Sequence, residues 1–326
     1  MREATVLEPT KITQISARRL ISIVTPCYNE QDNVDELYIR IKAAIAPFDY
    51  DFEVIFIDNH SSDRTVEKLR LLAAADASVK LIINTRNFGH IRSPYYGIIQ
   101  SRGVATIYMA SDLQDPPELI SEFIKYWEEG FKLVLAVKPV SQGSPLVHAI
   151  RKAYYRMLDR ISEITVLNDS TGFGLYDRVV LDQVRAVNDP YPYLRGLISE
   201  LGYEVKAIPF NQPRRLRGIS KNNLYSLYDI AMLGIVSHSK LPIRIAAFAG
   251  FLTGTLSLLA AIVFTILKLV FWYSYPMGIA PLVIGVFFLF GLQFLFVGIL
   301  GEYISSIHTY VQRRPIVVEK ERVNFD

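Results

Sequence analysis

Residues suited to ligand binding stand directly after two short apolar runs near the start of the chain. The first group is Thr25-Pro26-Cys27-Tyr28-Asn29-Glu30, where Pro26 turns the chain and Tyr28 and Glu30 can present a ring and a carboxylate to a base and a ribose. Asp58 follows the second run and can accept hydrogen bonds from a base or a sugar hydroxyl. The alternative for the first group is a turn that only caps the next helix.

Two further groups follow the third and fourth apolar runs. Arg86-Asn87-Phe88-Gly89-His90 brings together a cation, an amide and a glycine, as contacts to an anion or a sugar require, although a lone histidine such as His90 is more often structural. In the fourth group, Ser111-Asp112-Leu113-Gln114, we expect Asp112 and Gln114 to project to the same side of an extended segment. Their oxygen atoms would then suit a hard cation.

Two further aspartates are expected to cap helices. Asp63 stands just before the helix that follows the Asp58 loop. Asp115 is followed by Pro116 at what would be the first helical position and by Glu118 three residues on, which is the pattern of an N-cap with a capping box.

The groups require a scaffold that brings the ends of the apolar runs together. Five β-branched runs predict strands: Ile21–Thr25, Phe52–Ile57, Val79–Ile83, Ala105–Ala110 and Leu133–Val137. Segments with helical spacing lie between them: Asp32–Ile45, Arg64–Ala75, Ser93–Gln100 and Leu119–Glu129. This alternation predicts an open, mostly parallel α/β sheet, which binds ligands at the carboxyl ends of its strands.

The composition indicates a membrane protein and excludes several other classes. Hydrophobic residues make up 51% of the 326 residues, and the mean hydropathy is +0.23. The net charge of +3, without a basic stripe, gives no support to a nucleic-acid partner. Cys27 is the only cysteine, so no internal disulfide forms, and we expect its side chain to be buried. Dinucleotide-binding, P-loop and zinc-ligand motifs are also missing.

Two uncharged runs lie near the end of the sequence. Ile245–Leu267 and Ile279–Leu300 have 23 and 22 residues, enough to cross a hydrocarbon core of ~30 Å as helices. Two buried helices of a soluble core are the less favoured alternative. Lysines and arginines flank the outer ends, so the positive-inside rule predicts a two-helix hairpin with the large N-terminal domain and both termini in the cytoplasm. Lys268 would snorkel to the far interface.

Taken in order, the four groups resemble the motifs of inverting family 2 glycosyltransferases of GT-A fold. The closer resemblance is to the polyprenyl-phosphate glycosyltransferases, which include dolichyl-phosphate mannose synthases and bactoprenol glucosyltransferases. Two later segments extend it to about Pro315: Arg215–Lys221, similar to the family's Arg-x-x-Gly-x-Ser-Lys, and Gly301-Glu302-Tyr303 with Arg314-Pro315 after it. The resemblance divides the chain into a GT-A domain (1–210), a juxtamembrane segment (211–242), two transmembrane helices (243–302) and a cytoplasmic tail (303–326).

The resemblance also implies roles for individual residues. The nucleotide sugar would contact Pro26, Tyr28, Glu30, Asp58, Asn87, His90, Ser111 and Asp112. Mg²⁺ or Mn²⁺ on the diphosphate would be held by Asp112 and Gln114. Catalysis would involve Asp112, Asp169, Arg215 and Lys221, with Asp169 as a base or a sugar contact. The lipid phosphate would bind Arg215, Arg217, Ser220 and Lys221.

The chemistry of the acceptor favours catalysis by positively charged side chains over catalysis by a general base. A lipid phosphate monoester is already anionic near pH 7, by analogy with phosphorylated side chains, so its oxygen hardly needs a general base. Guanidinium and ammonium groups can instead position it and neutralise its charge. The alternative for the Arg215–Lys221 cations is contact with anionic lipid headgroups.

The chain departs from the family pattern at two positions. Many relatives have Asp-x-Asp where this chain has Ala110-Ser111-Asp112, so a metal would keep more water or more phosphate ligands. Relatives often have Ser-Gly-Phe-Arg where this chain has Thr171-Gly172-Phe173-Gly174, so Gly174 removes a cation, and Asn168 or Asp169 would then face the sugar.

The segment before the first apolar run has an amphipathic pattern. Leu224, Leu227, Tyr228, Ala231 and Ile235 form one stripe between Asn222 and Leu241. It either lies in the membrane interface or packs on protein. The resemblance favours a homo-oligomer, with a tetramer the preferred form.

The leading hypothesis is an enzyme that transfers a hexose, glucose from UDP-glucose, to undecaprenyl phosphate at the cytoplasmic face of a bacterial plasma membrane. The alternative is a catalytically weak nucleotide-sugar-binding membrane protein or scaffold. A processive polysaccharide synthase is disfavoured, because the sequence has two apolar runs and no Gln-x-x-Arg-Trp segment.

Overall fold

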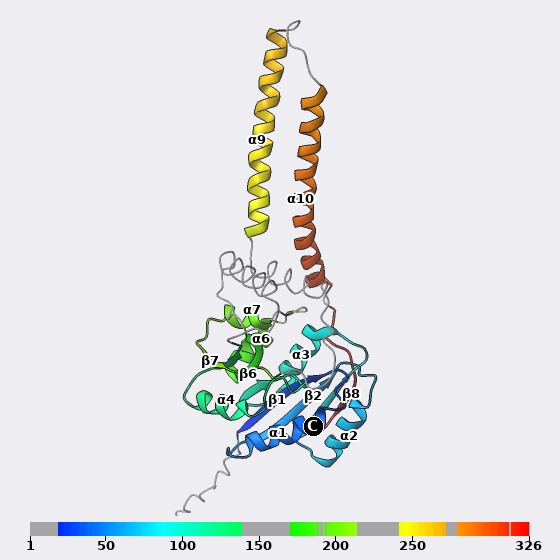
Figure 1. The fold of residues 1–326 in the computed structure, drawn as a ribbon, viewed down its shortest axis with the longest axis vertical. Coiled ribbons are helices and arrows are strands. Elements are labelled where there is room, and N and C mark those ends of the chain that lie inside the picture. The colour runs from blue at the N-terminus through cyan, green and yellow to red at the C-terminus, as the bar shows by residue number, and fades with distance from the viewer. Residues whose placement is uncertain are drawn as a thin grey trace, which may run out of the picture.

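The structure is a computed structural model that describes residues 19–138, 170–187, 189, 192, 194–213, 241–271, 279–312 and 314–325. Its centre is an eight-stranded sheet with the order β7-β5-β6-β4-β1-β2-β3-β8 (Figure 1). Two long helices rise from one end of this domain.

The first half of the sheet follows the predicted alternation. Its elements are β1 (Leu20–Cys27), α1 (Val34–Ile45), β2 (Asp51–Asp58), α2 (Thr65–Ala75), β3 (Val79–Asn84), α3 (Gly89–Gln100), β4 (Ala105–Tyr108), α4 (Leu119–Glu128) and β5 (Leu133–Val137). Strands β4, β1, β2 and β3 are parallel neighbours, which confirms the predicted parallel core. Helix α3 begins at Gly89, four residues earlier than expected, and β4 ends at Tyr108 rather than Ala110.

The remaining strands make the sheet mixed. β6 (Ser170–Asp177) runs antiparallel between β4 and β5, and β7 (Val205–Pro209) pairs parallel with β5. Helices α6 (Arg178–Val187) and α7 (Leu194–Glu200) lie between β6 and β7 in the sequence. β8 (Glu319–Val323) comes from the C-terminal end of the chain and pairs antiparallel with β3.

Helices cover both faces of the sheet, so the strands are apolar along nearly their whole length. On one face, α1, α2 and α4 pack against side chains such as Ile23, Phe56 and Leu81. On the other, α3, α6 and α7 pack against Val24, Ile57 and their neighbours. Alternate residues of each strand therefore serve opposite halves of the core. Cys27 is buried in the first half, as predicted.

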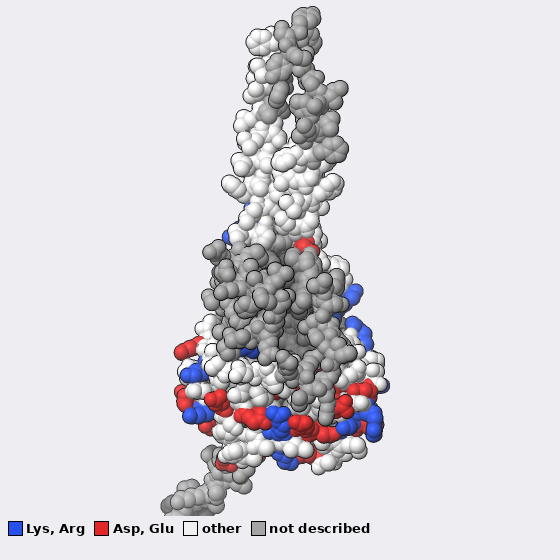
Figure 2. Space-filling view, viewed as in Figure 1, with Lys and Arg blue, Asp and Glu red and all other residues white. Residues whose placement is uncertain are grey.

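Helices α9 (Leu241–Val270) and α10 (Ile279–Val311) lie side by side and contact each other (Figure 1). Figure 2 shows charged side chains gathered over the sheet domain and an almost uncharged shaft above it. Within the described residues, Phe288–Val311 is long and apolar enough to cross a membrane, with a mean hydropathy of 1.6. Leu241–Ser257 is a shorter apolar helical segment. The amphipathic stripe predicted between Asn222 and Leu241 lies within residues 214–240, which are outside the described residues. The Lys268 side chain is also outside them.

Candidate active site

The four groups singled out in the sequence meet at the carboxyl edge of the parallel strands. Hydrogen bonds join them directly: the Asn29 amide nitrogen donates to Ser61 Oγ at 2.9 Å, and Ser111 Oγ donates to the Pro26 carbonyl at 2.7 Å. Because β1 lies between β2 and β4, the loop after β1 contacts both neighbouring loops. The edge is therefore one continuous polar surface.

Asp58 is the last residue of β2 and its side chain is buried. Its carboxylate accepts the Ser61 backbone N–H at 3.0 Å and the Ser61 hydroxyl. Burial raises the pKa of Asp58, while the bonds from Ser61 act in the opposite direction. Ser61 also accepts the Asn29 N–H. Asp58 therefore holds the loop after β2 against the loop after β1 through Ser61. The loop after β1 begins with half-buried Tyr28.

Glu30 lies at the entrance to α1 and is half-buried. Asn33 Nδ2 donates to Glu30 Oε2 at 2.5 Å, and the Glu30 N–H donates to Thr65 Oγ1 at 2.8 Å. Asp63 accepts the N–H of Thr65, the first residue of α2, at 3.0 Å and that of Gln31 at 3.3 Å. The capping role predicted for Asp63 is wrong, because the N-cap of α2 is Arg64 and no side chain caps this helix. The Asp63 carboxylate instead holds the loops after β1 and β2 together.

Asn59 makes four side-chain hydrogen bonds at this edge, and no pattern in the sequence predicts this role. Its side chain is 7% exposed. Nδ2 donates to Asn87 Oδ1 at 2.9 Å and to the Gly89 carbonyl at 3.1 Å, while Oδ1 accepts the Phe88 N–H at 2.8 Å and Asn84 Nδ2 at 3.2 Å. All four bonds tie the end of β2 to the loop between β3 and α3. A short asparagine after an aspartate looks like an ordinary turn residue, so only the tertiary contacts reveal its role.

The loop between β3 and α3 presents cations around one aromatic ring. The guanidinium of Arg86 lies 4.0 Å from the centre of the Phe88 ring, and that of Arg92 lies 5.4 Å from it. Phe88 is buried, whereas Arg86, Asn87 and His90 are exposed at the edge. The bond between Asn59 Nδ2 and Asn87 Oδ1 places Asn87 beside the Asp58–Asn59 turn, and His90 is the second residue of α3.

The loop after β4 is a tight turn rather than the expected extended segment. Leu113 has a φ of 59°, and Asp112 Oδ1 accepts the Gln114 N–H at 3.1 Å. Gln114 Nε2 donates to the Pro213 carbonyl at 3.2 Å, which orients its side-chain amide. Ser111 and Asp112 are both buried at this edge, with Asp112 8% exposed.

The predicted capping role of Asp115 and Glu118 is wrong. Helix α4 begins at Leu119 with Glu118 as its N-cap, and no side chain caps it. Asp115 instead accepts the Ala110 N–H at 2.9 Å and is 4% exposed. Burial raises its pKa to about 6. Glu118 forms a two-bond ion pair with Arg40 on α1 at 2.8 and 2.9 Å, so Pro116 and Pro117 precede the helix rather than begin it.

The chemistry of the donor set fits a hard cation with few protein ligands. Asp112 and Gln114 carry a carboxylate and an amide oxygen within one turn, where Asp112 Oδ1 accepts the main-chain N–H of Gln114. Within the described parts of the chain, no group of three histidine, cysteine, aspartate or glutamate residues could hold a metal ion. A cation here would therefore depend on ligand oxygens and water for most of its coordination.

Gly174 occupies a position that admits no side chain. Its φ is 156°, and a Cβ there would lie 2.2 Å from the Val134 carbonyl oxygen, at an irregularity in the β5–β6 pairing. The departure from the family pattern thus has a local physical reason in this backbone.

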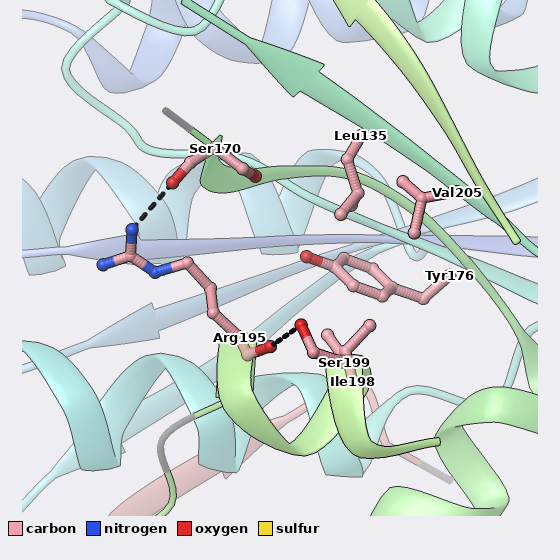
Figure 3. A pocket seen from close by; sticks show the side chains of 7 residues that line it. All are labelled: Leu135, Ser170, Tyr176, Arg195, Ile198, Ser199 and Val205. Carbon is pink, nitrogen blue, oxygen red and sulfur yellow. Dashed lines mark hydrogen bonds between the residues drawn. The ribbon is translucent and has the colours of Figure 1, made fainter. Parts of the chain in front are cut away.

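A small pocket lies beside the start of β6, between β5, β7 and α7 (Figure 3). Arg195 Nη1 donates to the Ser170 carbonyl at 2.7 Å across its mouth. Leu135, Tyr176, Ile198 and Val205 form its apolar wall. Arg195 was not anticipated from the sequence, because a single arginine in a short helix has no distinctive pattern.

Five expected site residues, Asp169, Arg215, Arg217, Ser220 and Lys221, lie outside the described residues. The described part of the candidate site consists of the loops at the carboxyl ends of β1 to β4.

Comparison with known proteins identifies the family. The profile described as Glycosyl transferase family 2 matches residues 22–185, which include all four loops of this edge. This chain belongs to glycosyltransferase family 2. It is a glycosyltransferase, and its sheet with helices on both faces is the GT-A-like fold of that family.

Individual relatives of this glycosyltransferase match nearly its whole length. The uncharacterized glycosyltransferase YkcC of Bacillus subtilis is 34% identical over 298 residues, which cover 91% of this chain and 92% of the relative. The SfII prophage-derived bactoprenol glucosyl transferase of Shigella flexneri is 30% identical over 302 residues, or 92% of this chain and 97% of the relative. Among solved structures, glucosyl-3-phosphoglycerate synthase from Mycobacterium tuberculosis aligns over 67% of this chain and 78% of that chain, with 18% identity and a TM-score of 0.43, too low to carry an argument.

Proposed function

We propose that the protein transfers glucose from UDP-glucose to undecaprenyl phosphate at the cytoplasmic face of a bacterial plasma membrane, with inversion at the anomeric carbon. The observation that carries the proposal is the match to a bactoprenol glucosyl transferase over 92% of this chain, a length that extends beyond the GT-A-like domain into its C-terminal helices. The polar edge at the ends of β1 to β4 supports it, because ligands of open α/β sheets bind there.

The donor nucleotide occupies this polar edge. Tyr28 and Glu30 contact the base and ribose, beside Pro26, and Asp58 accepts a hydrogen bond from the nucleoside. Asn87 and His90 reach the donor from the loop after β3, and Ser111 and Asp112 reach it from the loop after β4. The hydrogen bonds among these loops support the assignment, because they pre-organise the contacts before the donor arrives.

Asp112 and Gln114 are the residues that would hold Mg²⁺ or Mn²⁺ beside the donor diphosphate. A divalent cation bound there supplies positive charge that stabilises the leaving nucleoside diphosphate. The buried carboxylate of Asp112 and the orientation of Gln114 by Pro213 support this role. Phosphate oxygens and water would supply the other ligands, since the protein offers few of them.

The acceptor phosphate binds the basic segment that contains Arg215, Arg217, Ser220 and Lys221. One of its oxygens attacks the anomeric carbon as the bond to the UDP oxygen breaks, so UDP leaves from the opposite face. The acceptor is already ionised, and the cations position it and offset its charge. Asp169 contacts the sugar or accepts a proton near it.

α9 and α10 together cross the bilayer as a hairpin, with the sheet domain and both termini in the cytoplasm. The uncharged runs, the apolar shaft in Figure 2 and the basic residues that flank it support this topology. The protein functions as a homo-oligomer, with a tetramer preferred by the resemblance to its family.

The decisive experiment is transfer of radiolabelled sugar into an organic phase by purified protein in detergent. UDP-glucose is compared with other UDP and GDP sugars, using undecaprenyl phosphate and Mg²⁺ or Mn²⁺. We expect one lipid-linked product from UDP-glucose, inverted at its anomeric carbon. Asp112→Ala should abolish it and Lys221→Ala should raise the KM for undecaprenyl phosphate, whereas Glu67→Gln, on the exposed face of α2, should match the wild type.

A catalytically weak nucleotide-sugar-binding protein is the second candidate, favoured by Ala110 and Gly174 at positions where relatives carry an acid and a cation. The two candidates differ in turnover at saturating donor. UDP binding without any lipid-linked product from any donor would favour the second.

A further inference from the structure

The chain that leaves α10 returns to the catalytic sheet instead of ending at the membrane. β8 pairs antiparallel with β3, with Leu81 opposite Val323, Ile82 opposite Arg322 and Ile83 opposite Glu321. In Figure 1 this red segment descends from the base of α10 beside α3 and reaches the sheet next to β3. The sheet edge is thus closed by residues that follow the second long helix.

The same segment holds both ends of the loop that carries Asn87 and His90. The backbone N–H and the Oγ1 of Thr85, directly before that loop, donate to the Val318 carbonyl at 3.0 and 3.1 Å. Arg92, in the first turn of α3, donates from Nη2 to the Pro315 carbonyl. Both acceptors are main-chain oxygens, so each bond depends on the position of the chain after α10 rather than on a flexible side chain.

The residues around this segment are themselves bonded to the sheet domain, so the three bonds connect the loop to an anchored part of the chain. Val317 is 6% exposed. Asn324 Nδ2 donates to the Ala73 and Val79 carbonyls, both at 2.8 Å, which ties the end of β8 to α2 and β3. Arg322 donates to Gln100 at the end of α3 at 2.8 Å.

We infer that the segment Pro315–Val318 is a positioning element for donor binding, and that it couples the donor loop to α10. This inference rests on the proposed function, because it takes Asn87 and His90 as donor contacts. Without the bonds to Thr85 and Arg92, the loop samples other conformations, and the donor must order it on binding. We expect the element to act on donor affinity and not on the chemical step, because its bonds are to Thr85 and Arg92 at the two ends of the donor loop.

The test uses a double variant that combines Thr85→Val and Arg92→Gln. Its control is the single variant Arg70→Gln. The double variant removes the two side-chain hydrogen bonds to the Pro315–Val318 segment. Arg70→Gln removes an exposed ion pair to Glu321 on β8, the strand that follows this segment, and leaves the loop untouched. Loss of two hydrogen bonds of ordinary strength should raise the Kd for UDP and the donor KM about tenfold, with kcat within about twofold. The Kd for UDP in Arg70→Gln should match the wild type. An unchanged Kd in the double variant, or a fall in kcat at unchanged KM, would overturn the inference.

A second measurement keeps the inference testable if the double variant fails to fold. Leu81→Cys with Val323→Cys places two thiols opposite each other on neighbouring strands, and the native Cys27 is buried. Oxidation should give a crosslink within one chain, seen as a monomer on a denaturing gel, with UDP affinity retained. A crosslinked dimer would overturn it, because β8 would then belong to another copy.

The readout separates this inference from the proposed function. UDP binding needs neither acceptor nor transfer, so it reports on the Pro315–Val318 segment by itself. Absence of any lipid-linked product from the wild type would count against the proposed reaction alone.

Discussion

Asp115 Oδ2 accepts the backbone N–H of Ala110 at 2.9 Å, across the loop that carries Ser111 and Asp112. The bond closes a turn in which Leu113 adopts a φ of 59° and Asp112 accepts the Gln114 N–H. Only the backbone of Ala110 takes part in this bond. Position 110 therefore helps to shape the turn through its main-chain N–H. Asp115 is thereby a positioning residue for Asp112.

The first prediction concerns this bond. Asp115→Ala leaves the Ala110 N–H without its acceptor, which costs about 1–3 kcal/mol and loosens the turn that aims Asp112. We expect kcat to fall about 10- to 100-fold, with a smaller change in the Kd for UDP. Asp115→Asn retains an oxygen for the same N–H and should keep most of the rate. Steady-state transfer with both variants checks this, and a wild-type rate in Asp115→Ala would contradict it.

The second prediction concerns the metal. Removal of divalent cations with EDTA should stop transfer, and Mg²⁺ or Mn²⁺ should restore it. Asp112→Asn should lower kcat/KM by about 10²-fold or more, because an amide binds a hard cation more weakly than a carboxylate does. It should also raise the Mn²⁺ concentration needed for half-maximal rate. Equal Mn²⁺ requirements in Asp112→Asn and the wild type would remove Asp112 from the metal site.

Much of the scaffold and the location of the site could be predicted from the sequence. Strands buried on both faces, such as Phe52–Ile57, give continuous apolar runs that need no tertiary information to detect. Parallel strands then bring their carboxyl ends to one edge, so Asp58 and Asp112 could be assigned to the same surface before any contact was known.

The remaining features depend on contacts between distant residues. Glu319–Val323 is a charged run that has no strand pattern of its own, and it becomes a strand because β3 offers an unpaired edge. The Asp115-Pro116-Pro117-Glu118 pattern suited a helix start, but Asp115 instead accepts the N–H of half-buried Ala110, and Glu118 pairs with Arg40 on α1. Local preference yields to tertiary contacts in both cases.

The third prediction concerns Asn59. Asn59→Ala removes four hydrogen bonds and leaves the Phe88 N–H and the Asn84 amide without their acceptor. We expect a lower thermal midpoint and a Kd for UDP raised about tenfold or more, since Asn87 loses its support. Gln183→Ala, which removes an exposed bond to Tyr203, should change neither. Binding of UDP to detergent-solubilised protein is the measurement, and an unchanged Kd in Asn59→Ala would show that Asn87 does not need this network.

The fourth prediction is a pH dependence of stability away from the site. Asp76 accepts hydrogen bonds from Tyr38 and from Ser78, and Lys42 Nζ lies 3.0 Å away, so these donors hold the pKa of Asp76 well below its ordinary value. A folded pKa below the unfolded value means that the stabilisation is present above about pH 4 and is lost as the pH falls further. Asp76→Asn should lower the thermal midpoint by roughly 2–5 °C at pH 7.

The difference between wild type and Asp76→Asn should then shrink as the pH falls below about 4, because the unfolded chain takes up a proton at Asp76 there while the folded protein takes it up only at lower pH. Lys42→Met gives the matched comparison, because it removes the exposed ion pair and leaves the bonds from Tyr38 and Ser78 in place. It should therefore cost less at pH 7, since an exposed ion pair contributes about 0–1 kcal/mol. Thermal unfolding of the protein in detergent across this pH range decides the matter. Parallel midpoint curves for wild type and Asp76→Asn would show that the Asp76 charge does not stabilise the junction of α1 with the α2–β3 turn.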